Sequence, residues 1–122
     1  MKHYRILIVT ALVLLGLGAL FLALRPELTA TTDEPREQVY GIEIEDDAMS
    51  PVEVGVGQGD QVTLRFTSDA PVEVHLHGYD LEEEVEPGEE TELSFEAELS
   101  GQFEIENHET EAALGALLVE PR

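Results

Sequence analysis

The sequence predicts an all-β sandwich domain that follows a single apolar helix. Three observations lead to this fold class. A largely apolar run occupies residues 6–24, short segments of alternating apolar and polar residues fill the chain from residue 39 onwards, and glycine or proline turns separate these segments. Alternation with a period of two is typical of half-buried strands, and about seven such strands separated by turns are typical of a sandwich or barrel.

The apolar run at residues 6–24 predicts a transmembrane helix. A helix of this length spans about 28 Å, close to the thickness of the hydrocarbon core of a bilayer. Lys2 and Arg5 precede it and favour a cytoplasmic N-terminus. A cleaved signal peptide is the alternative, but its apolar region would be unusually long, and the best cleavage point, after Ala30, lacks the Ala-x-Ala pattern. We favour an uncleaved membrane anchor at residues 1–25. Both interpretations place the rest of the chain outside the cytoplasm, in the periplasm or the extracellular space.

Composition excludes several classes of function. The chain has 27 acidic residues against 6 basic ones, a formal net charge of −21, and its first acidic residue is Glu27. Nucleic acid is therefore excluded as a partner, because phosphate binding needs a basic surface. The chain has no cysteine, which excludes disulfides, thiolate metal ligands and thiolate catalysis. No nucleophile–base motif is visible either, so we expect no enzymatic activity.

The chain divides into an anchor, a linker at residues 26–38 rich in Thr, Glu, Asp, Pro and Arg, and a globular domain at residues 39–122. Residues 107–113 are either a loop or a short helical turn capped by Asn107. The turns are predicted at residues 57–60, 68–71, 86–89 and 100–101. The strands are predicted at residues 39–45, 52–56, 62–67, 72–77, 79–85, 92–97, 103–105 and 114–119.

Two histidines share one predicted strand at residues 72–77. Val72, Val74 and Leu76 alternate with His75 and His77, so both imidazoles lie on the face opposite the core. Residues i and i+2 of a strand are roughly 6.5 Å apart at Cα, close enough for two rings to bind one metal ion with bonds of about 2.0–2.1 Å. Two solvated histidines on an outer face are the alternative.

Several segments of the domain have an order and spacing that resemble one family. They are residues 59–64, the turn 87–88 followed by residues 93–95, residues 101–105, and His108 followed by residues 115–119. In this order they resemble cupredoxin-like domains, the family of plastocyanin and azurin. The resemblance covers about residues 52–120 and implies a Greek-key β-sandwich. It also implies that His75 or His77 takes the place of the upstream copper ligand and His108 that of the loop histidine.

The sequence departs from the family at the metal site. A blue-copper centre needs a cysteine thiolate, two histidines and usually an axial methionine. The resemblance places the cysteine between Ile105 and Asn107 and the axial ligand near Ala113, and neither residue type is there. The chain is therefore predicted to lack a blue-copper centre. Three histidines remain as candidate ligands for copper, with zinc as a substitute, and three carboxylates lie close to them in sequence: His75, His77 and His108; Asp80, Glu106 and Glu109.

The functional prediction is a membrane-anchored domain outside the cytoplasm that binds or handles copper through histidines. The alternative is a metal-free accessory sandwich that docks on a membrane complex such as an oxidase or a transporter.

Overall fold

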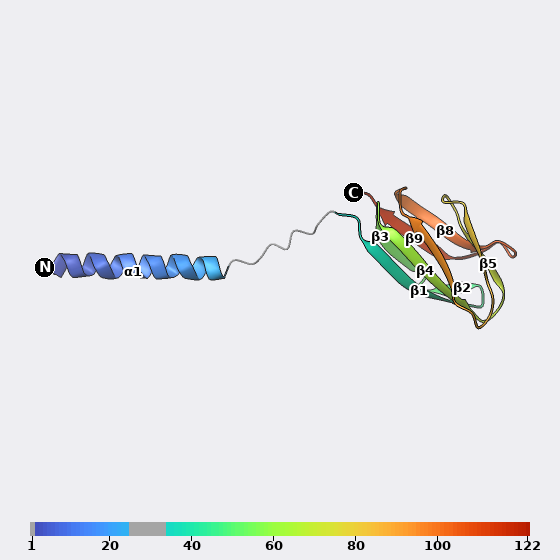
Figure 1. The fold of residues 1–122 in the computed structure, drawn as a ribbon, viewed down its shortest axis with the longest axis horizontal. Coiled ribbons are helices and arrows are strands. Elements are labelled where there is room, and N and C mark those ends of the chain that lie inside the picture. Colours follow the sequence, from blue (N-terminus) through green and yellow to red (C-terminus); the bar gives the residue numbers. More distant parts are fainter. Residues whose placement is uncertain (1, 25–33) are drawn as a thin grey trace. The chain divides into compact units, whose positions relative to one another are not determined.

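The computed structural model describes residues 2–24 and 34–122, which belong to two separate compact units (Figure 1). The first unit contains helix α1, Lys2–Ala23, whose side chains are all exposed and whose length and composition are sufficient to cross a membrane. The predicted linker lies partly outside the described residues, at positions 26–33. The sheet structure begins at Glu37, earlier than the expected residue 39.

The second unit is a two-layer β-sandwich, which confirms the predicted all-β fold (Figure 1). One sheet has the strand order β2-β1-β4-β7 and the other β3-β9-β8-β5-β6. Strands β1 and β4 pair in parallel, as do β3 and β9, and the other pairs are antiparallel. Within residues 34–122 the strands are β1 Glu37–Glu45, β2 Ala48–Ser50, β3 Glu53–Gly57, β4 Gln61–Ser68, β5 Val72–Leu76, β6 Leu81–Val85, β7 Thr91–Glu96, β8 Gly101–Asn107 and β9 Ala112–Glu120.

The alternating pattern of the sequence defines which side of each strand faces the core. In β4 and β5 every second side chain is buried, and the buried ones are aliphatic or Phe66. Strand β2 was not predicted; its central residue, Met49, is buried in the core and packs against Gly115. In the ambiguous segment at residues 107–113, residues 108–111 form a turn between β8 and β9, not a helix, and the flanking residues belong to these two strands.

A buried carboxylate joins three distant segments at one end of the sandwich. Asp60, in the turn before β4, is fully buried and accepts hydrogen bonds from the backbone amides of Arg36 at 2.7 Å and Gly57 at 2.8 Å, and from the Arg122 guanidinium. Burial alone would raise the pKa of Asp60, but these hydrogen bonds and the charge of Arg122 lower it to about 2. Asp60 thus stabilises the fold as an anion.

We expect Asp60→Asn to lower the free energy of unfolding by roughly 2 kcal/mol at pH 7, because an amide places donors where three donors already point. The folded pKa of Asp60 lies below its ordinary value of 3.8, so Asp60 contributes its stability above about pH 3.8 and loses it as the pH falls towards about 2. Denaturant unfolding at pH 7 and pH 2.5 should therefore show a difference between wild type and variant that shrinks in acid. Asp69→Asn, at an exposed position, is the control; an unchanged difference across this range would contradict the role of Asp60.

The acidic surface should make the stability of the domain depend on salt. All 27 acidic residues lie in residues 26–122, against three arginines. Because salt screens repulsion between exposed charges, the melting temperature should rise between low and molar NaCl. Calorimetry of the detergent-solubilised chain measures this, and a flat melting temperature would contradict it.

Candidate metal centre

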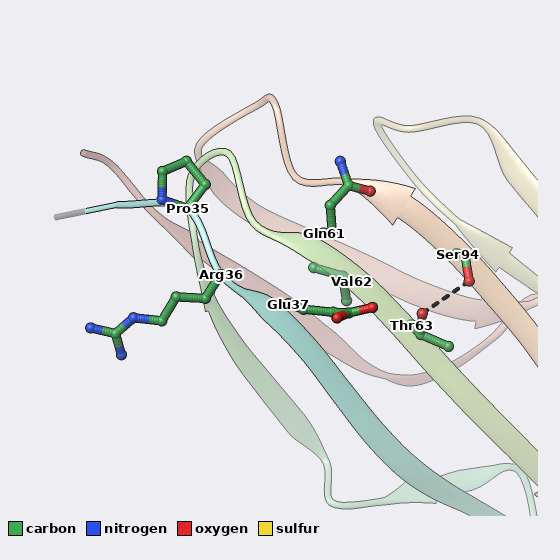
Figure 2. Close-up of a pocket in the computed structure, with 7 residues that line it drawn as sticks. All are labelled: Pro35, Arg36, Glu37, Gln61, Val62, Thr63 and Ser94. Atoms are coloured by element: carbon green, nitrogen blue, oxygen red, sulfur yellow. Dashed lines mark hydrogen bonds between the residues drawn. The ribbon is translucent and has the colours of Figure 1, made fainter. Parts of the chain in front are cut away.

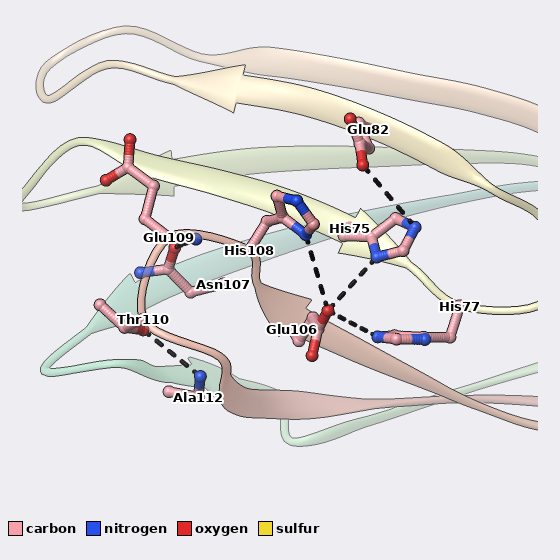
Figure 3. Close-up of polar contacts among 9 residues, drawn as sticks. All are labelled: His75, His77, Glu82, Glu106, Asn107, His108, Glu109, Thr110 and Ala112. Atoms are coloured by element: carbon pink, nitrogen blue, oxygen red, sulfur yellow. Dashed lines mark hydrogen bonds and ion pairs between the residues drawn. The ribbon is translucent and has the colours of Figure 1, made fainter.

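A row of three facing side chains crosses the outer surface of the five-stranded sheet (Figure 3). His75 on β5 pairs with Glu82 on β6 on one side and with Glu106 on β8 on the other. Because neighbours in register on one face of a sheet stand about 5 Å apart, these three side chains are held within reach of one another. The His75 and Glu106 side chains are only 15% and 14% exposed, although they lie on the outer face.

One oxygen of Glu106 is the centre of the histidine cluster. Its Oε1 lies 2.7 Å from His77 Nε2, 3.3 Å from His75 Nδ1 and 3.8 Å from His108 Nδ1 (Figure 3). The contact with His77 lowers the pKa of Glu106; partial burial opposes this shift and the contact with His75 reinforces it. Glu106 is therefore a carboxylate at neutral pH, and ring nitrogens from three positions of the chain converge on one point.

The turn after β5 aims His77 at this point. The His77 amide donates to the Glu104 carbonyl at 3.0 Å, and Gly78 follows with φ +83°. A Cβ at Gly78 would lie 2.4 Å from the Phe103 ring, so this position requires glycine in both conformation and space. Tyr79 fixes the next residue of the turn, with its hydroxyl donating to the Leu99 carbonyl at 2.8 Å.

His77 Nε2 is a buried nitrogen with no aligned hydrogen bond to any described residue. Its 2.7 Å contact with Glu106 is short, but the N–H direction that a hydrogen bond requires does not point at the oxygen. A buried polar atom without a hydrogen bond is costly, and a lone pair directed into a ligand set is what a metal ion needs.

His108 reaches the cluster from the turn between β8 and β9. Its amide donates to the Glu73 carbonyl at 2.8 Å. Buried Asn107 holds the turn, since its side-chain amide donates to Asp47 Oδ1 at 3.0 Å and its Oδ1 accepts from the Glu109 amide at 3.2 Å. The His108 ring centroid lies 5.4 Å from that of His75.

The three predicted histidines are close together but fall into two overlapping ligand sets. His75, His77 and Glu106 form one set, and His75, Glu82 and His108 form the other; within each set the ligand atoms lie within 4.8 Å of one another. No set among the described residues contains both His77 and His108. Of the three neighbouring carboxylates considered from the sequence, only Glu106 belongs to a set; Asp80 is exposed in the turn, and Figure 3 shows the Glu109 carboxylate directed away from the cluster.

The donor atoms suit copper or zinc. Imidazole nitrogens with a carboxylate oxygen bind Cu(II) and Zn(II), and a tetrahedral ion with bonds of about 2.0–2.1 Å needs its ligand atoms roughly 3.4 Å apart. Because the ligand atoms of each set lie within 4.8 Å of one another, their separations would change by at most about 1.4 Å. Met49, whose thioether is a soft ligand of the kind that Cu(I) sites use, is buried in the core.

The chain matches a known domain family over most of its length. The sequence profile of the family described as Cupredoxin-like domain matches residues 12–119.

The chain belongs to the cupredoxin-like domain family.

Solved structures with this fold include several copper proteins and an oxidase. A copper binding protein in the apo form matches with TM-score 0.60 and 13% identity, covering 72% of this chain and 99% of that one. The metal binding domain of the Streptococcus pneumoniae D39 Cu(I) exporting P-type ATPase CopA, with Cu(I), matches with TM-score 0.61 and 16% identity, covering 72% and 97%. A chain of a heme-copper terminal oxidase dimer matches with TM-score 0.57 and 18% identity, covering 98% and 100%. A search of curated protein sequences returned no match.

Within this cupredoxin-like domain, sequence reasoning missed one residue of the cluster. Glu82 belongs to the run Glu82-Glu83-Glu84, which composition alone marks as a solvated surface. The alternation in β6 could have identified Glu82 as a residue of the outer face. Glu82 and Glu84 point outwards in this strand, whereas Glu83 and Val85 are less exposed. Only the register of β5 with β6 then shows that Glu82 faces His75.

A pocket elsewhere on the cupredoxin-like domain has no metal-binding chemistry of this kind. It has a volume of about 530 Å³ and lies against β1, β4 and β7 of the other sheet (Figure 2). Thr63 and Ser94 share a hydrogen bond of 3.0 Å within it. None of its lining residues is a histidine, so the cluster on the five-stranded sheet is the candidate site.

Proposed function

We propose that this chain is a membrane-anchored cupredoxin-like domain, located outside the cytoplasm, that holds or passes one Cu(II) ion through His75, His77 and Glu106. One observation carries the proposal. The ring nitrogens of His75 and His77 converge on Glu106 Oε1, and the nitrogen of His77 is buried without an aligned hydrogen bond.

Each residue of this inner site has a distinct role. His77 Nε2 and His75 Nδ1 supply nitrogen ligands, and the carboxylate of Glu106 supplies oxygen and negative charge. Glu82, 3.9 Å from the other nitrogen of His75, orients that ring, as outer carboxylates commonly do for ligating histidines. Glu106 lies between Ile105 and Asn107, where the family resemblance implies a cysteine. The proposed site therefore has a carboxylate ligand where the family has a thiolate.

The electrostatics of the domain favour cation capture. The acidic surface raises the local concentration of any cation, and the carboxylates alone bind divalent ions weakly and diffusely. A Cu(II) affinity that falls when a single histidine is replaced therefore distinguishes a defined site from diffuse binding by surface carboxylates.

We expect His77→Ala or Glu106→Gln to weaken Cu(II) binding by about 10- to 100-fold, because the first removes a nitrogen ligand and the second removes the negative charge of the oxygen ligand. Isothermal titration of the detergent-solubilised protein measures this. Glu53→Gln makes the same chemical change as Glu106→Gln on β3, an edge strand of the same sheet, and should bind like wild type. Bound Cu(II) should lack an intense band near about 600 nm, since no thiolate is present. The proposal fails if wild type binds no more tightly than a variant with alanine at His75, His77 and His108.

A second candidate function rests on the match to the oxidase chain, which spans nearly all of this chain and includes α1. In this alternative the domain is a metal-free accessory subunit of a membrane complex. Purification in mild detergent distinguishes the two: a stable complex combined with no histidine-dependent copper binding supports the accessory role.

The anchor is tested separately. If α1 spans the membrane and is retained, the protein should stay in the membrane pellet after washes with salt and carbonate. The reason is that these washes do not extract a largely apolar helix of 22 residues from the bilayer. Mass spectrometry of the N-terminus is the matched measurement. Release of a soluble form beginning near Thr31 would contradict a retained anchor.

A further inference from the structure

The two ring nitrogens of His75 face carboxylates on two different strands. Nδ1 lies 3.3 Å from Glu106 Oε1 on β8, and Nε2 lies 3.9 Å from Glu82 Oε1 on β6. A neutral imidazole has one N–H, so it donates to only one of these carboxylates. Its other nitrogen then presents a lone pair towards an anion, an arrangement that a cation placed between them would stabilise.

A third ligand is already present on the Glu82 side. His108 brings a ring nitrogen to within 4.8 Å of the ligand atoms of His75 and Glu82. The side chains of Glu82 and His108 are 48% and 52% exposed. In the inner set Glu106 is 14% exposed, and the His77 side chain is 45% exposed but its Nε2 is buried. The Glu82 side of His75 is therefore the side that an ion arriving from solvent meets first.

We propose that His75, Glu82 and His108 form a second cation position, an outer site, that captures Cu(II) or Zn(II) from solvent before the inner site holds it. The proposal rests on the inner site described above. In this proposal the outer site uses His75 Nε2, the nitrogen that faces Glu82, and the inner site uses Nδ1, the nitrogen that faces Glu106. The two sites share this ring, and the domain holds one ion at a time.

The hydrogen on His75 links the two positions. With an ion on Nε2, the Nδ1–H donates to Glu106; with an ion on Nδ1, the Nε2–H donates to Glu82. In the transfer His75 releases the ion from Nε2 and takes a proton there from water, while Nδ1 gives its proton to water and binds the ion. The charge of the ring and the oxidation state of the ion do not change. Filling both sites together would require His75 to lose both ring protons.

The outer site predicts different effects of removing ligands on either side of His75. With the full chain in detergent, His108→Ala or Glu82→Gln should slow Cu(II) capture in stopped-flow mixing by about tenfold. His108→Ala should also change the equilibrium affinity less than threefold, because it removes a ligand of the capture position alone. Glu84→Gln, the next outward-facing carboxylate of β6, is the matched control and should capture at the wild-type rate.

Nitrogen NMR of the Zn(II)-loaded protein identifies the ligating atom directly. His75 should bind through Nδ1 in wild type and through Nε2 in His77→Ala, which retains only the outer site. The same nitrogen in both proteins, two ions per chain, or capture rates of His108→Ala equal to those of Glu84→Gln would each overturn the outer site. The inner site stands in those cases if wild type still binds more tightly than the triple-histidine variant, and both proposals fail if it does not.

Discussion

The candidate site depends on the pairing of β5 between β6 and β8. This register places Glu82, His75 and Glu106 in one row across the outer face of the sheet. The buried alternation of Val72, Val74 and Leu76 fixes the register, because a slip by one residue would turn His75 into the core. The packing of the aliphatic core thus places these ionisable side chains close together. The contacts among the ionisable side chains are a consequence of this packing and are not needed to determine the fold.

The sequence was sufficient for the sandwich and for the outward face of His75, because both follow from local alternation within a strand. His77 was predicted in the same strand but lies in the turn after β5. The sequence was not sufficient for β2, whose three residues are too few to show a period. The same limit applies to the site: Glu106 was one of three carboxylates close to the histidines in sequence, and Glu82 was part of an acidic run. Their selection depends on the cross-strand register of β5 with β6 and with β8, which cannot be read from one strand alone.

The acidic residues of β6 serve the sheet in a second way. Strand β6 is an edge of the five-stranded sheet, where unpaired backbone groups invite association with another chain. Outward-facing Glu82 and Glu84 place charge along this edge and oppose such pairing. Edge protection by itself accounts for an acidic strand but does not explain why Glu82 lies in register with a half-buried histidine, and the proposed outer site accounts for that pairing.

The antiparallel pairing of β5 and β8 also explains why the three histidines do not form one ligand set. The two strands run in opposite directions. The chain that continues from His75 reaches His77, whose amide donates to the Glu104 carbonyl of β8. The chain that continues from Glu106 reaches His108, whose amide donates to the Glu73 carbonyl of β5. His77 and His108 therefore flank the central row from its two sides, and the His75 ring stands between them with centroid distances of 4.5 Å and 5.4 Å. Glu106 links the three rings, since one of its two carboxylate oxygens, Oε1, contacts all of them. A sheet surface of this kind favours two adjacent positions with a shared ligand over one three-histidine centre.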